Sequence, residues 1–386
     1  MTQLGRAAEM AAFLKSQQAE MVSLLGILVS SESPSSDLPR LMATADLVAD
    51  HGQRLLGQAP ERIQTQRSPA LRWQLPPVDS TAEPVLLLAH LDTVWPAGTL
   101  SRWPFSVSED RATGPGAFDM KAGLVQALFG IAALRHTGSA RPPIILLVTA
   151  DEEIGSPDGR ALVESAAHAA GAVLVLEASD DGRLKVARKG VGSYVLKIVG
   201  RAAHAGLEPE KGVNALIAAA RLVLELQGIA DTDNGTTVTP TLAAAGSAQN
   251  TVPAAASIAI DVRAATVAEQ QRVDHALRQL QPGGGASVTV DGGINRPPME
   301  ERAATELMEI ARRAANQCGL PTPGSARVGG GSDGNFTAAL GVRTLDGLGA
   351  VGAGAHAEGE YVMTSSMPER AALLAGLIFE LRESNR

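Results

Sequence analysis

Cysteine, aromatic side chains and positive charge are all scarce in this chain of 386 residues. The one cysteine, Cys318, excludes an intramolecular disulfide and a metal site made of several thiolates, so a metal would need His, Asp and Glu ligands. The formal net charge of -8 argues against a nucleic-acid partner, because neutralising phosphates requires a basic face. Aromatic residues make up 3%, which leaves few rings to stack on a large flat ligand.

Long hydrophobic runs are also missing. The apolar run from Leu24 to Val29 is too short to span a bilayer. The N-terminus lacks a basic stretch followed by a long apolar segment and a small-residue cleavage site. We therefore expect no membrane partner and a cytoplasmic location. Hydrophobic residues still make up 45% of the chain, enough for a sizeable core, and the length favours two domains.

The order of apolar runs and helical patterns predicts an α/β fold. Continuous apolar runs at 84–90, 144–149 and 172–176 are typical of buried strands in a parallel sheet. Helical patterns at 123–135 and 159–169 separate them, and this alternation implies a mixed, mostly parallel sheet between helices. Further elements are expected as helices at 3–29, 38–56, 303–317 and 368–381 and as a strand at 342–345.

The hydrophobic pattern changes near Lys189. Partly alternating stretches at 191–199, 256–262 and 286–290 flank one helix at about 213–227. This pattern predicts a smaller α+β domain inserted into the first, which makes the large domain discontinuous. The expected boundaries are residues 1–188 and 297–386 for the large domain and 189–296 for the inserted domain.

Histidine and acidic residues follow the predicted strands of the large domain. In open α/β sheets, ligands bind at the carboxyl ends of strands, so these side chains could converge on one spot. The set consists of His90 and Asp92 after the first strand, Glu152 and Glu153 after the second, Glu177 after the third, Asp119 in a loop that opens a helix, and His356 in a glycine-rich loop.

Imidazole and carboxylate groups in this number suit a catalytic pair of metal ions. Zinc accepts both donors and leaves a position open for water in catalytic sites. Two ions about 3.5–4 Å apart need a shared carboxylate, and a bound water then ionises near pH ~7. A free carboxylate must take the proton of that water and pass it to the leaving amine. The adjacent pair Glu152 and Glu153 fits this division, since one can bind metal while the other remains a base.

Four strings occur in an order that is typical of one known family. They are His90-Leu-Asp92-Thr93-Val94, Gly116-Ala-Phe-Asp119-Met-Lys121-Ala-Gly123, Asp151-Glu152-Glu153-Ile-Gly155 and Gly200-Arg-Ala-Ala-His204-Ala-Gly206. Together with the His356 loop, they resemble the M20 metallopeptidase family over nearly the whole chain, and its glutamate carboxypeptidase branch in particular. The resemblance implies hydrolysis of an amide or peptide bond beside a free carboxylate. It also implies that the large domain is catalytic and that the inserted domain is a lid and dimerisation domain.

The resemblance implies a role for each matching position. His90, Asp119 and Glu177 would hold one zinc ion, and Asp119, Glu153 and His356 the other, with cobalt or manganese as possible replacements. Glu152 would be the general base and then the acid, and Asp92 would orient His90. The peptide bond between Asp119 and Met120 is expected to be cis. Many relatives have Pro where this chain has Ala178, so the pattern departs from the family directly after Glu177.

The inserted domain would supply substrate contacts. In homodimers of the family, the residue that corresponds to His204 reaches into the active site of the partner subunit and stabilises the oxyanion. Asn250, Arg263 and Arg296 resemble positions that bind a substrate carboxylate, which a guanidinium can hold at two points. The partners implied are therefore a substrate with a free carboxylate and a second copy of the chain.

Other interpretations of the sequence remain open. An N-acyl amino acid deacylase or a dipeptidase of the same family would use the same metal ligands. The stretch Gly330-Gly-Ser332-Asp-Gly334 matches a nucleophile elbow, and Asp346 and His356 follow it in the order of a serine hydrolase. That alternative leaves His90, Asp119 and the Glu152–Glu153 pair unexplained. A non-catalytic binding protein on this fold is the third alternative.

Overall fold

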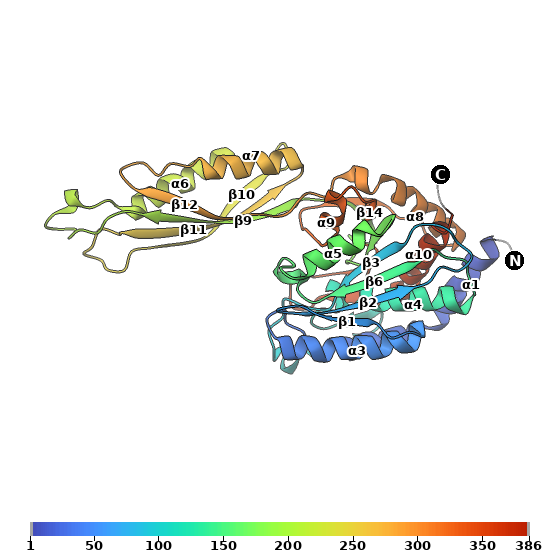
Figure 1. Cartoon of the computed structure of the whole chain (residues 1–386). Helices are drawn as coiled ribbons and strands as arrows, with labels where there is room; N and C mark the ends of the chain where they lie inside the picture. The colour runs from blue at the N-terminus through green and yellow to red at the C-terminus, as the bar shows by residue number, and fades with distance from the viewer. Residues whose placement is uncertain (1–2, 384–386) are drawn as a thin grey trace. The chain divides into compact units, whose positions relative to one another are not determined.

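The computed structural model describes residues 3–383, which form two compact units (Figure 1). The first unit comprises Met1–Ala187, Glu301–Val328 and Ser332–Arg386, and the second comprises Arg188–Glu300 and Gly329–Gly331. The chain therefore leaves the first unit near residue 188 and returns near residue 300. The short segment Gly329–Gly331 groups with the second unit because Arg188 donates hydrogen bonds to the carbonyl oxygens of Gly330 and Gly331, both at 3.2 Å.

The first unit is built on a six-stranded sheet with the order β1-β2-β6-β3-β7-β14. Its strands are β1 (Glu61–Gln64), β2 (Pro69–Leu75), β3 (Val85–His90), β6 (Ile144–Thr149), β7 (Ala172–Val175) and β14 (Thr344–Leu345). Strands β6, β3, β7 and β14 pair in parallel, whereas β1 and β2 are antiparallel. Every residue of β3, β6 and β7 is buried, as expected for strands covered on both faces. The sheet is mixed and mostly parallel, as the sequence predicted.

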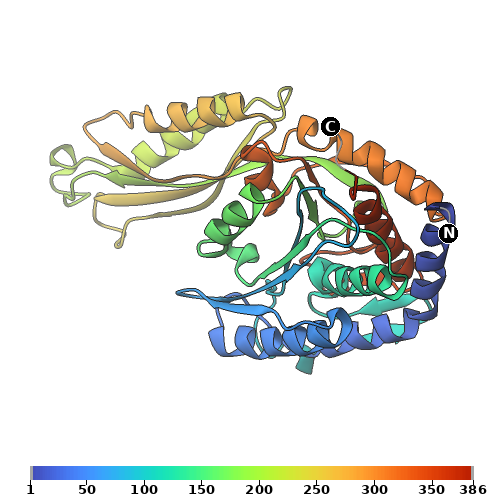
Figure 2. The same cartoon turned by 45° about the vertical axis from the view of Figure 1, so that its right-hand side comes forward.

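Helices cover both faces of this sheet (Figure 2). Helices α5 and α9 pack on one face, where Val163 and Phe336 join the strand residues Leu86 and Leu88 in one buried cluster. Helices α1 to α4 and α10 pack against one another, with α4 contacting the sheet. The helices are α1 (Gln3–Ser16), α2 (Gln18–Val29), α3 (Leu38–Leu56), α4 (Ala122–His136), α5 (Gly159–His168), α8 (Thr305–Gln317), α9 (Gly334–Ala339) and α10 (Ser366–Glu380).

One helical stretch of the described chain, 117–136, is long and apolar enough to cross a membrane by composition. Its most apolar window is 89% buried inside the fold, because α4 is the central helix of the first unit. Its apolar character is therefore that of a core helix.

A small sheet of short strands, with the order β15-β16-β5-β4, also belongs to the first unit. Its strands are β4 (Ser106–Ser108), β5 (Arg111–Thr113), β15 (Gly352–Ala353) and β16 (Tyr361–Met363). A separate ladder pairs β8 (Leu184–Arg188) with β13 (Ser325–Val328). The sequence analysis did not anticipate these strands, since two to five residues are too few for a periodicity to show.

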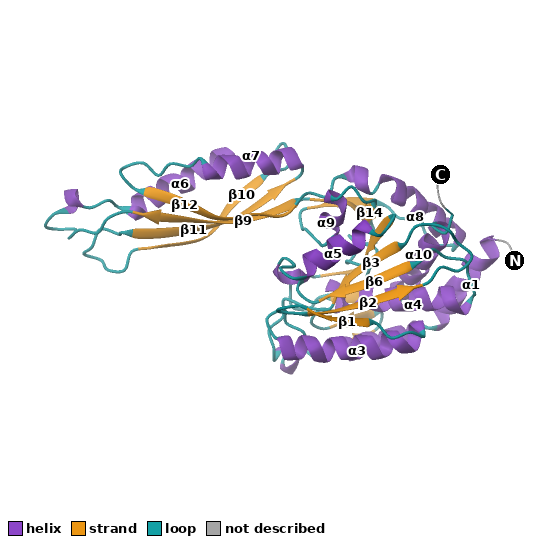
Figure 3. Cartoon of the chain, viewed as in Figure 1, coloured by secondary structure: helices purple, strands orange, loops and turns teal. Residues whose placement is uncertain are grey.

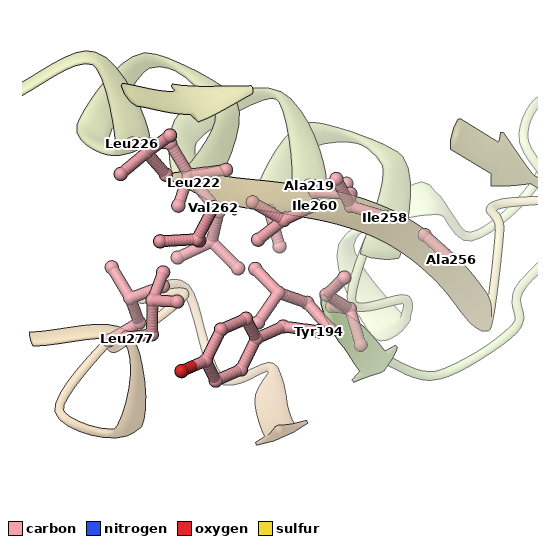
Figure 4. Packing of buried hydrophobic residues seen from close by; sticks show 14 of the residues in the cluster. Tyr194, Ala219, Leu222, Leu226, Ala256, Ile258, Ile260, Val262 and Leu277 are labelled. Atoms are coloured by element: carbon pink, nitrogen blue, oxygen red, sulfur yellow. The ribbon is translucent and has the colours of Figure 1, made fainter. Parts of the chain in front are cut away.

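The second unit is a four-stranded antiparallel sheet with two helices on one face (Figure 3). Its elements are β9 (Gly190–Val199), α6 (Ala215–Ile229), β10 (Thr237–Ala245), β11 (Ala255–Ala264), α7 (Val267–Arg278) and β12 (Ser287–Arg296). Alternate residues of β9 and β11 face the helices and form a closed apolar core around Tyr194, Ile260 and Leu222 (Figure 4). The sequence correctly predicted a smaller α+β domain. The prediction did not include strand β10 or helix α7.

Candidate metal centre

The parallel strands bring ligand-bearing residues to one edge of the large sheet. Strand β3 ends at His90, and its neighbours β6 and β7 run parallel to it, so their carboxyl ends lie at the same edge. Glu152 and Glu153 lie in a 3-10 turn just after β6, and Glu177 follows β7 by two residues. The order β6-β3-β7 places the histidine between the two acidic segments.

Asp119 comes from the loop that opens α4. A Cβ atom at Gly123 would collide with the carbonyl oxygen of Leu176, so glycine allows the start of α4 to approach the end of β7 closely. The peptide bond between Asp119 and Met120 is cis, which confirms the prediction. Lys121, two residues on, is buried and donates hydrogen bonds to the carbonyl oxygens of Leu28 and Ser31, at 3.0 and 2.8 Å. Burial lowers the pKa of Lys121 to about 7.

His356 lies in the loop of the β15–β16 hairpin. Strand β16 pairs with β5, which leads directly into the loop of Asp119, and Tyr361 is opposite Thr113 in this ladder. The hairpin thus carries His356 to Asp119 from a distant part of the chain. His356 has a φ of +61°, a left-handed conformation that is uncommon for a residue with a side chain and that often marks functional positions.

The imidazoles and carboxylates form two ligand groups that share Asp119. One consists of His90, Asp119 and Glu177, and the other of Asp119, Glu153 and His356. His90 Nε2 lies 3.6 Å from Asp119 Oδ1 and 3.5 Å from Glu177 Oε1. His356 Nε2 lies 3.3 Å from Asp119 Oδ2 and 3.1 Å from Glu153 Oε2. Ligands at about 2.0–2.1 Å from a tetrahedral zinc are themselves about 3.3–3.4 Å apart, so these separations suit two bound ions.

Two further observations fit a cation at each group. His90 Nε2 and Glu153 Oε1 are buried and make no hydrogen bond within the described residues. The carboxylates of Asp119 and Glu153 raise the pKa of His356 to about 10, so this cluster attracts positive charge. Burial raises the pKa of Glu153 itself, and the nearby charge of Asp119 adds to the effect. Metal ions would neutralise this concentration of carboxylates, and the donor set is of the type that zinc accepts.

Asp92 lies behind His90 and is buried. His90 Nδ1 is 3.1 Å from the carbonyl oxygen of Asp92 and 3.3 Å from its Oδ1. A proton on Nδ1 therefore has an acceptor, which leaves the lone pair of Nε2 for a metal. The same carboxylate accepts the backbone N–H groups of Glu152 and Glu153, at 3.3 and 3.2 Å. Asp92 thus orients the ring of His90 and also fixes the turn that carries both glutamates.

Glu152 belongs to neither ligand group. Its Oε2 lies 4.0 Å from His90 Nε2, and the residue is 8% exposed. A carboxylate at the edge of the ligand groups is near enough to exchange protons with a water molecule bound there. Glu153 thus lies within a candidate ligand group, and Glu152 lies beside it.

His204 and Asn250 lie on adjacent segments of the second unit. The N–H of Ala205 donates to the carbonyl oxygen of Asn250 at 2.9 Å, and His204 forms a bridge with Thr251. The exposed ring of His204 accepts hydrogen bonds at Nδ1 from the backbone N–H groups of Gly206 and Leu207, at 3.1 and 3.2 Å. These contacts place the ring proton on Nε2, where it can be donated.

Arg263 and Arg296 flank the same residue in the four-stranded sheet of the second unit. Arg263 on β11 and Arg296 on β12 both pair with Val191 of β9, so their side chains are on one face. The Arg263 guanidinium holds both carboxylate oxygens of Asp261, at 2.8 and 2.9 Å. Arg296 is buried, and its carbonyl oxygen accepts a hydrogen bond from Gln270 at 2.8 Å.

Ser332 is not arranged as a nucleophile. It is fully buried, and its hydroxyl donates to Asp346 Oδ2 at 2.6 Å. His356, the base that a serine hydrolase would need, instead faces Asp119 and Glu153. The serine-hydrolase alternative is therefore wrong in its geometry, and Ser332 stabilises a loop.

The sequence analysis assigned no role to three buried or half-buried residues near the ligands. They are Ser35, which hydrogen-bonds Asp92, Lys121, which anchors the loop of Asp119, and Glu360, a buried carboxylate in the hairpin of His356. Lys121 lies within a motif already singled out, and Glu360 directly follows the glycine-rich loop of His356. Ser35 gave no such signal, because a serine in a polar loop has many ordinary explanations.

An α/β fold with these two ligand groups defines a metal-dependent hydrolase. The sequence pattern of peptidase family M20/M25/M40 matches residues 86–380, and the chain belongs to this family. The family membership agrees with the resemblance seen in the motifs.

Characterised relatives and solved structures agree with this assignment. The chain is 34% identical to carboxypeptidase G2 of Pseudomonas sp. (strain RS-16), over 77% of this chain and 74% of that protein. It is 27% identical to succinyl-diaminopimelate desuccinylase of Thioalkalivibrio sulfidiphilus, over 77% and 84%. The fold is similar to aminopeptidase PepT of Bacillus cereus, with a TM-score of 0.79, 23% identity and coverage of 94% and 98%.

Proposed function

We propose that this protein cleaves an amide or peptide bond whose leaving amine carries a free carboxylate, in the manner of a glutamate carboxypeptidase. The observation that carries the proposal is the pair of ligand groups sharing Asp119, with the Glu152 carboxylate beside them. Similarity to carboxypeptidase G2 supports this choice of bond. We further propose two zinc ions per subunit, since His and carboxylate donors suit zinc, although cobalt or manganese accept the same donors.

The proposed mechanism assigns proton transfer to Glu152. Bound zinc ions would polarise the substrate carbonyl and make water acidic enough to ionise near neutral pH. Glu152 takes the proton of the attacking water and delivers it to the leaving nitrogen. Asp92 holds His90 and the turn of Glu152 in place throughout. His204 of a second subunit donates its Nε2 proton to the carbonyl oxygen as negative charge develops there.

The second unit would recognise the carboxylate of the substrate. Arg263 and Arg296 lie on one face of the four-stranded sheet of the second unit, Arg263 half-buried and Arg296 buried. A guanidinium can bind a carboxylate at two points. Arg263 already holds the carboxylate of Asp261 in this geometry, so a substrate carboxylate would have to displace Asp261 or bind the remaining Nη1 of the guanidinium. Asn250 would add an amide donor beside His204.

A homodimer is part of the proposal, because His204 is assigned to the site of the partner. The four-stranded sheet of the second unit supports a homodimer, since β10 is an edge strand whose residues from Thr241 to Ala245 are all exposed. Leu242 on this edge and Leu224 on α6 are 73% and 68% exposed. An edge strand beside exposed leucines is suited to pairing with another chain.

Similarity to a desuccinylase favours a second candidate, the hydrolysis of N-acyl amino acids or dipeptides in which the acyl group differs. The two candidates share the metal ligands and the base. They differ only in the groups recognised on either side of the cleaved bond, so they can be separated by substrates alone.

The test is a matched set of substrates incubated with the zinc-loaded protein. N-(p-aminobenzoyl)-glutamate is compared with its glutamate α-amide, which lacks the charged carboxylate, and with N-succinyl and N-acetyl amino acids and dipeptides. We expect release of free glutamate from the first compound and at least about 100-fold less cleavage of the amide. Equal cleavage of the acid and the amide would refute carboxylate recognition. Preferred cleavage of a succinyl, acetyl or dipeptide substrate would favour the second candidate.

A further inference from the structure

A segment that precedes the matched family region crosses behind the metal centre. This N-terminal strap (residues 30–37) joins α2 to α3, whereas the family match begins at residue 86. The Ser33 hydroxyl donates to the carbonyl oxygen of Leu91 at 2.7 Å, and the N–H of Thr93 donates to the carbonyl oxygen of Ser33 at 2.9 Å. One side-chain contact and one backbone contact of Ser33 therefore attach the strap to the residues on both sides of Asp92.

Ser35 contacts the Asp92 side chain itself. Its hydroxyl donates to Asp92 Oδ2 at 2.7 Å, and this oxygen also accepts the N–H of Glu153 at 3.2 Å. The other oxygen of Asp92 accepts the N–H of Glu152 and lies beside His90 Nδ1, both at 3.3 Å. One carboxylate thus contacts both the proposed ligand His90 and the turn of two glutamates, and it can do so only while its plane keeps one orientation about the Cβ–Cγ bond.

We propose that Ser35 is a positioning residue of the metal centre, whose hydroxyl fixes the rotation of the Asp92 carboxylate. The terminal torsion of an aspartate is broad and is set by its hydrogen-bond partners. The backbone donors come from the turn that Asp92 must itself hold, whereas Ser35 comes from a separate segment. Without the hydroxyl, the Asp92 carboxylate can rotate, and the positions of the His90 ring and the turn of Glu152 are less firmly held. The inference rests on the metal centre proposed above, but not on the identity of the substrate.

Metal release tests the proposal without any substrate. Zinc-loaded wild type, Ser35→Ala, Ser35→Thr and Ser33→Ala are mixed with an excess of a coloured chelator, and the rate of zinc transfer is recorded. Loss of contacts behind a ligand typically weakens metal binding about 10–100-fold, so we expect Ser35→Ala to release the His90 ion about tenfold faster. Ser35→Thr keeps the hydroxyl and should stay within about twofold of wild type.

Ser33→Ala is the matched control, because it removes a hydroxyl of the same strap that does not touch Asp92. It should lower the thermal unfolding temperature while zinc release stays near the wild-type rate. The visible absorption of the cobalt-loaded proteins should change for Ser35→Ala alone, since it reports ligand geometry. The proposal would be overturned if Ser35→Ala released zinc at the wild-type rate, or if both alanine variants released zinc equally faster than wild type. If no substrate is ever cleaved, the release rates still decide the role of Ser35.

Discussion

At the scale of single residues, the centre depends on contacts behind the ligands as much as on the ligands. Asp92 serves His90 and two backbone N–H groups at once, and Lys121 ties the loop of Asp119 to the end of α2. The two candidate ligand groups could be proposed from the sequence, because metal chemistry restricts ligands to few residue types in recognisable strings. The role of Ser35 could not be predicted, because serine is common in polar loops. Only the folded structure shows that its hydroxyl contacts the Asp92 carboxylate.

The division of labour between the adjacent glutamates gives a residue-scale prediction. Glu152→Gln should lower turnover by about 10²–10⁴-fold, because the proton acceptor is lost, while two zinc ions remain bound. Glu153→Gln should instead reduce the zinc content, since Glu153 Oε2 faces His356 Nε2 at 3.1 Å. Zinc analysis and initial rates on the same samples measure both effects. Unchanged turnover in Glu152→Gln would show that another group is the base.

At the scale of elements, the parallel strands of the six-stranded sheet were predictable, whereas its antiparallel strands β1 and β2 and the short strands of the β15-β16-β5-β4 sheet were not predicted. The apolar runs that form β3, β6 and β7 are long enough to be predicted as strands from the sequence. The hairpin that carries His356 has strands of only two and three residues. Its position is fixed by pairing with β5, far away in the chain, and no local pattern records that pairing. The same holds for β10, whose strand contains Pro240 and few large apolar residues.

The close approach of α4 to the end of β7 gives an element-scale prediction. Gly123→Ala should destabilise the protein by about 1–3 kcal/mol, because the new methyl group collides with the backbone of Leu176. Gly228 is the matched control, since it is also helical and its Cβ would meet nothing within 4 Å. Gly228→Ala should be neutral or slightly stabilising in urea unfolding. Equal stability of the two variants would show that the contact at Gly123 relaxes freely.

At the scale of the whole molecule, two units with separate cores divide the proposed work. The first contains every proposed metal ligand and the base, and the second contains His204, Asn250, Arg263 and Arg296. The discontinuous arrangement could be anticipated from the change in hydrophobic period near residue 190. The exact boundaries could not, because residues 329–331 join the second unit through hydrogen bonds of Arg188 rather than through any pattern of their own.

A site shared between two subunits gives a prediction at this scale. Chains with Glu152→Ala lack the base, and chains with His204→Ala lack the proposed oxyanion donor, so each homodimer should be nearly inactive. A mixed dimer has one intact combination, and unfolding and refolding an equal mixture should restore about a quarter of wild-type activity, given random pairing and one working site in half the dimers. Light scattering on the same samples checks that dimers form. Dimers without restored activity would contradict the shared site.

The central claim is that activity depends on two metal ions held by the groups that share Asp119. The most direct measurement removes the metal with a chelator, confirms its absence by elemental analysis, and then follows glutamate release from N-(p-aminobenzoyl)-glutamate as zinc is added back. The account predicts no turnover without metal and recovery that is complete at about two zinc ions per chain. Full turnover by the metal-free protein, or full recovery in an Asp119→Ala variant, would contradict it.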